Sequence, residues 1–228
     1  RHPPLPAWDW TLMSHWLQTA DFRVEPAGPP SATFPRKLPP EDPSYGVTWM
    51  YNQAQAIQAA LAMDDLPTAE RLAKALLALP RAGGAWHNAY VTESRAVATA
   101  LPAEQASSWT GPNMAIGHAL LNLLERTADP QLAEQLLAAA LDLVGWLTRL
   151  TTDRGEEAYV SVGEQNRQVW TEHNQRAFAF YYQLYHQFTH PQSPHQALLA
   201  RARQRVAVDT LKQRADKIIH WIQTTMWA

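Results

Sequence analysis

The chain of 228 residues contains no cysteine, which excludes disulfides and cysteine-ligated metal sites within it. Charged residues are also scarce, since Asp, Glu, Lys and Arg make up 18% of the chain and the formal net charge is -2. A protein that follows a phosphate backbone needs a basic face. The sequence therefore predicts that nucleic acid is not a partner.

Long hydrophobic runs are missing as well. The longest apolar stretch, from about Leu136 to Leu147, is interrupted by Asp142 and is shorter than the roughly 18 apolar residues of a membrane-spanning helix. We expect no transmembrane segment, and a protein that is soluble or peripherally attached. The chain begins with Arg1; a cleaved signal peptide would account for this start and predicts a periplasmic or extracellular location, and a longer parent chain would account for it equally.

No Gly-rich phosphate loop, nucleophile elbow or dinucleotide-binding fingerprint occurs in the sequence. Among the nine histidines, His186 and His190 have the i, i+4 spacing of helical zinc ligands, and His195 follows them. These three lie at a predicted helix break, away from the expected cleft, where exposed polar residues are the ordinary interpretation. We expect no cofactor and no metal site.

Proline dominates the segment from residue 23 to 46, where it removes backbone donors and favours extended geometry. Before this arm, Trp8, Leu12 and Trp16 follow one another at four-residue spacing, which is typical of a short amphipathic helix. The sequence thus predicts an N-terminal region over residues 1–46 that comprises a short helix and a Pro-rich arm.

Helical periodicity dominates from Val47 to the end of the chain, and we predict a helical-hairpin domain over residues 47–228. Three hairpins are expected, over about 48–79, 112–150 and 172–226. Each is interrupted once, near a proline that suits the first turn of a helix or stops the preceding one: Pro67, Pro130 and Pro191. In the third hairpin we expect one continuous second helix from about Pro194 to Met226.

The hairpins repeat at a fixed interval. Asn52, Asn113 and Asn174 each lie near the start of a first helix, 61 residues apart, and the two connectors between hairpins both contain a glycine followed by Ala-Tyr-Val. A constant interval of this length is the signature of stacked supersecondary units, either a solenoid or a closed toroid. Long connectors with aromatic residues, around Trp86 and Tyr159, favour the toroid.

Three short strings resemble the six-hairpin glycosidase superfamily, more narrowly its bacterial members with a Thr-Glu-His-Asn motif before an inner helix. They are Trp-Met-Tyr-Asn-Gln-Ala at 49–54, Thr-Gly-Pro-Asn at 110–113 and Trp-Thr-Glu-His-Asn at 170–174, within a resemblance that covers about residues 45–228. The resemblance implies an all-α fold, an (α/α) toroid whose inner helices begin at a cleft where many members hydrolyse or bind polysaccharides.

Two features depart from that pattern. Only three hairpins are present, which implies a half-toroid whose open flanks are covered by a protein partner or a missing chain segment. Related sequences also commonly place Asp where this chain has Asn52, and an amide cannot act as a general acid or base near neutral pH.

Glycoside cleavage usually needs two carboxyl groups that flank the scissile bond. Glu172, at the predicted start of an inner helix, is the best single candidate, although it also suits the positive end of a helix capped by Thr171. Spacing singles out no second carboxylate, and Glu93 can equally form an ion pair with Arg95. The candidates for this second group are Glu93, Glu156, Glu157 and Glu164.

Residues that offer amides or flat aromatic faces near the helix starts are candidates for binding sugar. The asparagines can instead cap or bridge helices, and the tryptophans can pack in the interior, as we expect of Trp146 and Trp221. The predicted substrate-binding residues are Tyr51, Asn52, Trp86, Trp109, Asn113, Trp170, His173 and Asn174.

The sequence supports two functions. The first is a carbohydrate-active, glycoside hydrolase-like protein that binds or cleaves a polysaccharide or oligosaccharide in a toroid cleft. The second is a non-catalytic helical-repeat scaffold or an accessory subunit of a larger protein complex. Fold resemblance alone does not decide between them.

Overall fold

The computed structural model of the chain describes residues 46–190, 194–204 and 206–226. Most of these residues are helical, and the expectation of a mostly helical fold is confirmed. The predicted N-terminal helix and Pro-rich arm lie outside the described residues. Within the described ranges, no helix is long and apolar enough to cross a membrane.

The described helices form three hairpins, and we call the first helix of each hairpin inner and the helix that returns along it outer. The first is α2 (Met50–Ala62) with α3 (Leu66–Leu77), and the second is α5 (Thr110–Leu124) with α6 (Pro130–Leu150). In the third, α7 (Thr171–Thr189) is followed by α8 (Gln196–Arg203) and α9 (Val208–Met226).

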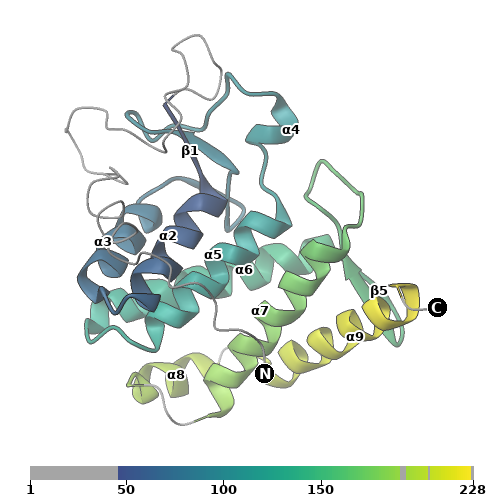
Figure 1. Cartoon of the computed structure of the whole chain (residues 1–228). Coiled ribbons are helices and arrows are strands. Elements are labelled where there is room, and N and C mark those ends of the chain that lie inside the picture. The colour runs from purple at the N-terminus through teal and green to yellow at the C-terminus, as the bar shows by residue number, and fades with distance from the viewer. Residues whose placement is uncertain (1–45, 191–193, 205, 227–228) are drawn as a thin grey trace, which may run out of the picture.

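The inner helices α2, α5 and α7 lie side by side in that order, and α3, α6 and α9 each pack against their own inner helix (Figure 1). The central helix α5 is enclosed by its neighbours, because 13 of its 15 residues are buried. Its two remaining side chains, His118 and Asn122, lie one turn apart and are half-buried. The enclosed layer therefore leaves a single polar stripe on α5.

Outer and inner helices begin differently. The outer helices α3 and α6 start with an Asp N-cap and a proline in the first turn, and Asp129 Oδ1 accepts hydrogen bonds from the backbone N–H groups of Gln131 (3.0 Å) and Leu132 (3.1 Å). The inner helices instead follow a tryptophan with extended backbone: Trp49, Trp109 and Trp170. These residues lie 60 and 61 positions apart.

The predicted continuous helix from Pro194 to Met226 is wrong, because the chain forms two helices, α8 and α9. The four residues between Arg203 and Val208 include neither proline nor glycine, so no sequence signal marks a break there. Each of the two helices packs its own apolar residues into the core: α8 buries Leu199, and α9 buries Val208 and Leu211.

Short antiparallel strands, which the helical periodicity did not predict, follow each of the first two outer helices. After α3 come β2 (Arg81–Ala82) and β3 (Ala85–Trp86), and after α6 come β5 (Thr151–Arg154) and β6 (Glu157–Val160). Gly83 and Gly84 have φ of 58° and 95°, the pair of positive values that a two-residue hairpin turn favours. The first described strand, β1 (Val47–Trp49), pairs with β4 (Ala89–Val91). A short helix, α4 (Ala103–Ala106), precedes α5.

The tryptophan N-caps define which residues of the inner helices are equivalent. The fourth residue after each cap is buried, and these residues are Gln53, Asn113 and Asn174. Asn52 is half-buried and precedes the equivalent position by one residue. The predicted asparagine register therefore holds for the second and third hairpins but not for the first, where Gln53 takes the place assigned to Asn52.

Candidate functional site

The amino-terminal ends of α5 and α7 bring two tryptophans and a histidine together. The rings of Trp109 and Trp170 meet edge to face with centroids 5.8 Å apart, and the Trp170 ring lies 5.0 Å from that of His173. Trp170 is 40% exposed, whereas His173 is buried and its Nδ1 has no hydrogen-bond partner. Burial lowers the pKa of His173 to about 4, so the ring is neutral near neutral pH.

Next to this cluster, Arg176 joins the first and third inner helices. Its Nη2 donates to the hydroxyl of Tyr51 (2.8 Å), and its guanidinium carbon lies 4.9 Å from the centre of the same ring. Its Nε also donates to Glu172 Oε1 (3.0 Å), within an i, i+4 ion pair on α7. The resulting triad of Tyr51, Arg176 and Glu172 combines a phenol, a cation and an anion.

From this triad a strip of amides and imidazole crosses the three inner helices. Asn122 Nδ2 on α5 donates to Gln58 Oε1 on α2 (2.9 Å), and Gln183 Nε2 on α7 donates to Asn122 Oδ1 (2.5 Å). Gln183 Oε1 in turn lies 2.7 Å from His118 Nδ1. Because each of these four side chains is half-buried, the strip holds its groups in place and still reaches the surface.

Besides His173, three more of the predicted substrate-binding residues lie inside the fold. Trp86 is fully buried and its indole N–H donates to the carbonyl of Leu76 (3.0 Å). Asn113 and Asn174 are also fully buried, and both bond to backbone groups of the strands that precede their helices. We therefore leave these three out of the candidate site.

The other predicted residues lie near or beyond the triad. Glu172 and Trp170 are exposed at the start of α7, Tyr51, Trp109 and Asn52 are half-buried, and Glu93 is exposed in the turn after β4. The alternative carboxylates are engaged elsewhere, because Glu164 pairs with Arg149 (3.5 Å) and Glu157 accepts from Thr224 (2.6 Å), while Glu156 is exposed in the β5–β6 turn. Glu172 is thus the one carboxylate of the triad, while at the carboxyl end of α5 Gln187 donates to Glu125.

Sequence reasoning missed Arg176 and the strip. The signal available was the polar pair His118 and Asn122, four residues apart in the part of α5 that is otherwise apolar after Asn113. A polar stripe on a central helix indicates the side on which apolar side chains do not cover that helix. Its partners on α2 and α7 are 58 to 65 residues away in the chain, and no local pattern identifies them.

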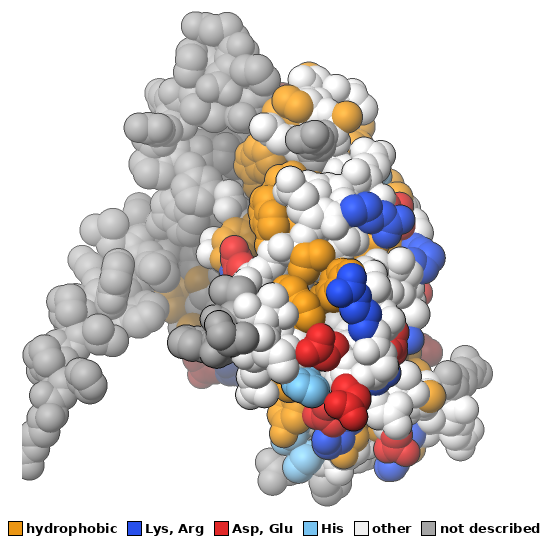
Figure 2. Space-filling model, turned by 90° about the vertical axis from the view of Figure 1, so that its right-hand side faces the viewer, with side chains coloured by type: hydrophobic (Ala, Val, Ile, Leu, Met, Phe, Trp, Pro, Cys, Tyr) orange, Lys and Arg blue, Asp and Glu red, His pale blue; other side chains and the backbone are white. Residues whose placement is uncertain are grey.

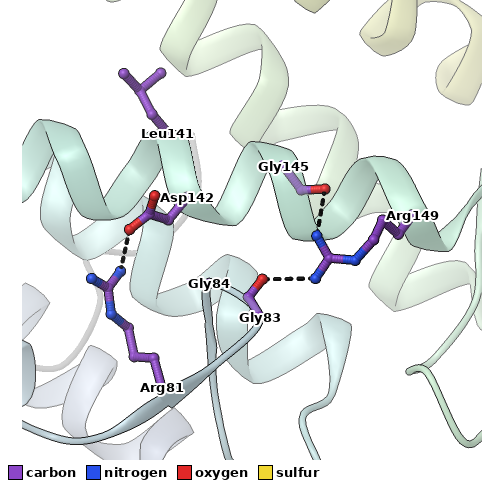
Figure 3. Close-up of a pocket in the computed structure, with 7 residues that line it drawn as sticks. All are labelled: Arg81, Gly83, Gly84, Leu141, Asp142, Gly145 and Arg149. Atoms are coloured by element: carbon purple, nitrogen blue, oxygen red, sulfur yellow. Dashed lines mark hydrogen bonds and ion pairs between the residues drawn. The ribbon is translucent and has the colours of Figure 1, made fainter.

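A hollow of about 570 Å³ lies away from these residues, between α6 and the turn of the β2–β3 hairpin (Figure 3). Two arginines line it, and both have partners: Arg81 pairs with Asp142 (2.9 Å), and Arg149 Nη2 donates to the carbonyl of Gly83 (2.7 Å). Because these contacts fasten the turn to α6, the arginines have a structural role there.

Among the described residues, no group of three or more His, Asp or Glu side chains is arranged to hold a metal ion. The stacked imidazoles of His186 and His190, with centroids 3.6 Å apart, are a pair at the carboxyl end of α7. Comparison with known protein families, curated proteins and solved structures finds no match for this chain.

Proposed function

We propose that the protein binds an uncharged oligosaccharide or polysaccharide along the inner helices, in the cleft of an (α/α) toroid or half-toroid. The observation that carries this proposal is the strip of Gln58, His118, Asn122 and Gln183, which spans three helices that are distant in sequence. Amide and imidazole groups both donate and accept hydrogen bonds, as sugar hydroxyls do. A ligand that matches this chemistry is rich in hydroxyls and needs no compensating charge.

Aromatic residues at one end of the strip strengthen the case. Trp170 is exposed at the start of α7, and half-buried Tyr51 lies at the start of α2 with the Arg176 guanidinium over its ring. Binding sites for small ligands commonly combine apolar surface with a few fixed polar groups. The site is therefore suited to one sugar ring at the helix starts and further units along the strip.

Binding is better supported than cleavage. Hydrolysis of a glycoside by the usual mechanisms requires two carboxyl groups about 5 to 10 Å apart. Glu172 is the one carboxylate of the triad, and Arg176 engages it in an ion pair. Glu125 lies at the opposite end of α5, where Gln187 donates to it. The proposal therefore assigns Glu172 to positioning Arg176 and to contact with the ligand.

Binding can be tested by isothermal titration of the purified protein with a panel of neutral and acidic oligosaccharides. We expect a neutral glycan to bind, and the substitutions Gln58→Ala and Asn122→Ala each to weaken the affinity about fivefold, since one hydrogen bond contributes roughly 1 kcal/mol. The matched control is Gln135→Ala, which removes an exposed amide from the outer helix α6 and should leave binding unchanged.

The outcome that would refute the proposal is wild-type affinity in both strip variants, or no binding to any glycan of the panel. Release of reducing ends from the same glycans tests cleavage directly. Release by the wild-type protein that Glu172→Gln abolishes would show a hydrolase and would require a second carboxylate.

A helical-repeat scaffold is the second candidate function. It is favoured by Tyr182, a large aromatic residue that is 48% exposed on an inner helix. Aromatic residues exposed in this way are typical of protein interfaces.

A further inference from the structure

The third inner helix is exposed on a side that the first two bury. Counted from the tryptophan N-caps, each inner helix carries two equivalent residues on the side that faces the next inner helix. In α2 and α5 these residues are buried, whereas in α7 the first is half-buried and the second is 48% exposed. The pairs are Ile57 and Leu61, Gly117 and Leu121, and Phe178 and Tyr182.

Phe178 and Tyr182 stack on each other, with ring centroids 6.0 Å apart and planes inclined by 29°. Together with Gln175, which is exposed one turn earlier, they form what we call the α7 flank. Figure 2 views the molecule from the right-hand side of Figure 1, a face on which hydrophobic side chains lie among charged and polar ones. By its position in the repeat, the α7 flank is suited to a further inner helix.

The contact between α5 and α7 shows how neighbouring inner helices fit together. A Cβ on Gly117 would lie 2.5 Å from Phe180 Cε2, and one on Gly111 would lie 2.6 Å from His173 Nε2. The glycines of α5 therefore receive the rings of α7, and large side chains on one helix meet very small ones on the next.

The side of α2 that faces away from α5 carries small residues at the positions where α7 carries the rings that contact α5. Counted from the N-caps, Asn52 is equivalent to His173 and Ala59 is equivalent to Phe180. Both Asn52 and Ala59 are half-buried. We call these two residues the α2 flank. Between α5 and α7 the small residue is Gly117 on the earlier helix and the large one is Phe180 on the later helix. Between the α7 flank and the α2 flank the large residue would be on α7 and the small one on α2, so the combined side-chain volume would be similar.

We propose that a second copy of this chain docks its α2 flank against the α7 flank. The order of inner helices α2, α5 and α7 would then continue into α2 of the second copy. The interface is head-to-tail, because two different surfaces meet, and it repeats from copy to copy until a ring closes or a filament forms. The polar strip is built on another side of the same helices, so this inference goes beyond the sugar-binding proposal and does not depend on it.

Analytical ultracentrifugation of the full chain over a range of concentrations tests this proposal. We expect species larger than the monomer, and two single substitutions should each raise the dissociation constant at least tenfold: Tyr182→Glu on the α7 flank and Ala59→Arg on the α2 flank. The control Gln135→Glu adds the same charge as Tyr182→Glu on the outer helix α6 and should assemble as the wild type does.

Mixing the two variants identifies the pairing. The Tyr182→Glu chain keeps an intact α2 flank and the Ala59→Arg chain keeps an intact α7 flank, so the mixture should form dimers that neither variant forms alone. If the mixture remains monomeric while the wild type dimerises, the flanks do not pair with each other and the proposal fails. A wild-type protein that is monomeric at every concentration overturns it as well.

Circular dichroism checks that each variant is folded, and Asn52→Arg replaces Ala59→Arg if the latter is not.

Discussion

The side-chain amide of Asn113 binds both backbone polar groups of Trp86. Its Oδ1 accepts from the Trp86 N–H (2.8 Å), and its Nδ2 donates to the Trp86 carbonyl (2.9 Å) and to that of Trp109 (2.9 Å). Asn174 makes the same three bonds with Val160 and Trp170. In the second and third hairpins, one buried amide thus connects an inner helix to the strand that ends the preceding hairpin.

Replacement of either asparagine by alanine should be strongly destabilising. Each substitution leaves a buried N–H, a buried carbonyl and a part-buried carbonyl without these partners, and we expect a loss of about 2 to 4 kcal/mol in the free energy of unfolding. Chemical denaturation monitored by circular dichroism measures this loss for Asn113→Ala and Asn174→Ala.

Asn52→Ala is the matched control, because Asn52 lies one residue before the equivalent position. It should cost less than about 1 kcal/mol. A loss for Asn52→Ala equal to that for Asn113→Ala would contradict the alignment of the repeats on their tryptophan caps.

The hairpin repeat could be predicted because its signals are local. Helical periodicity, together with Asp and Pro at Asp65-Leu66-Pro67 and Asp129-Pro130, indicated where the outer helices begin. The alignment of the first hairpin was wrong by one residue, since a constant interval between asparagines outweighed the tryptophans at intervals of 60 and 61. The strands escaped prediction because two to four residues are too few for an alternating pattern to register.

Gly117 lets α5 and α7 approach, and its substitution by alanine should weaken their contact. The added Cβ would lie 2.5 Å from Phe180 Cε2 and 2.7 Å from Cδ2, so the ring has to move within a packed interior. We expect Gly117→Ala to destabilise the protein by about 1 to 3 kcal/mol, although alanine is the better helix former.

A second substitution separates this steric cause from others. Phe180→Leu alone should be destabilising, and combined with Gly117→Ala it should cost less than the sum of the two single losses. Additive losses in thermal or chemical denaturation would show that the Cβ and the ring do not collide.

His173 should make stability depend on pH. Burial lowers its pKa from 6.5 to about 4, so between these values the unfolded chain binds a proton that the folded chain excludes. Stability contributed by neutral His173 is therefore complete above about pH 6.5 and decreases as the pH falls towards 4, by up to about 3 kcal/mol.

The variant His173→Asn, which adopts the residue found at the equivalent position of α2, cannot titrate in this range. The difference in unfolding free energy between wild type and variant should be constant above pH 7 and change between about pH 6.5 and 4. A difference that stays constant throughout would rule out a depressed pKa at His173.

The candidate site was only partly predictable. Glu172, His173 and Tyr51 were found because they lie at helix starts, a position that sequence signals define. Arg176 was missed because its role depends on Tyr51, which is 125 residues away and reaches it only through the packing of α2 and α7 around the start of α5. Contacts of this kind depend on how each helix is rotated about its axis, which periodicity limits only approximately.

That long-range contact leads to a final prediction. Arg176 both donates to the Tyr51 hydroxyl and lies over its ring, so a double-mutant cycle with Tyr51→Leu and Arg176→Leu should give a coupling energy of about 1 kcal/mol in the free energy of unfolding. Arg176 is also paired with Glu172, so Glu172→Gln should lower this coupling by releasing the guanidinium. A coupling near zero in the wild-type background would mean that the guanidinium spends its time in solvent and that α2 and α7 are joined only through α5.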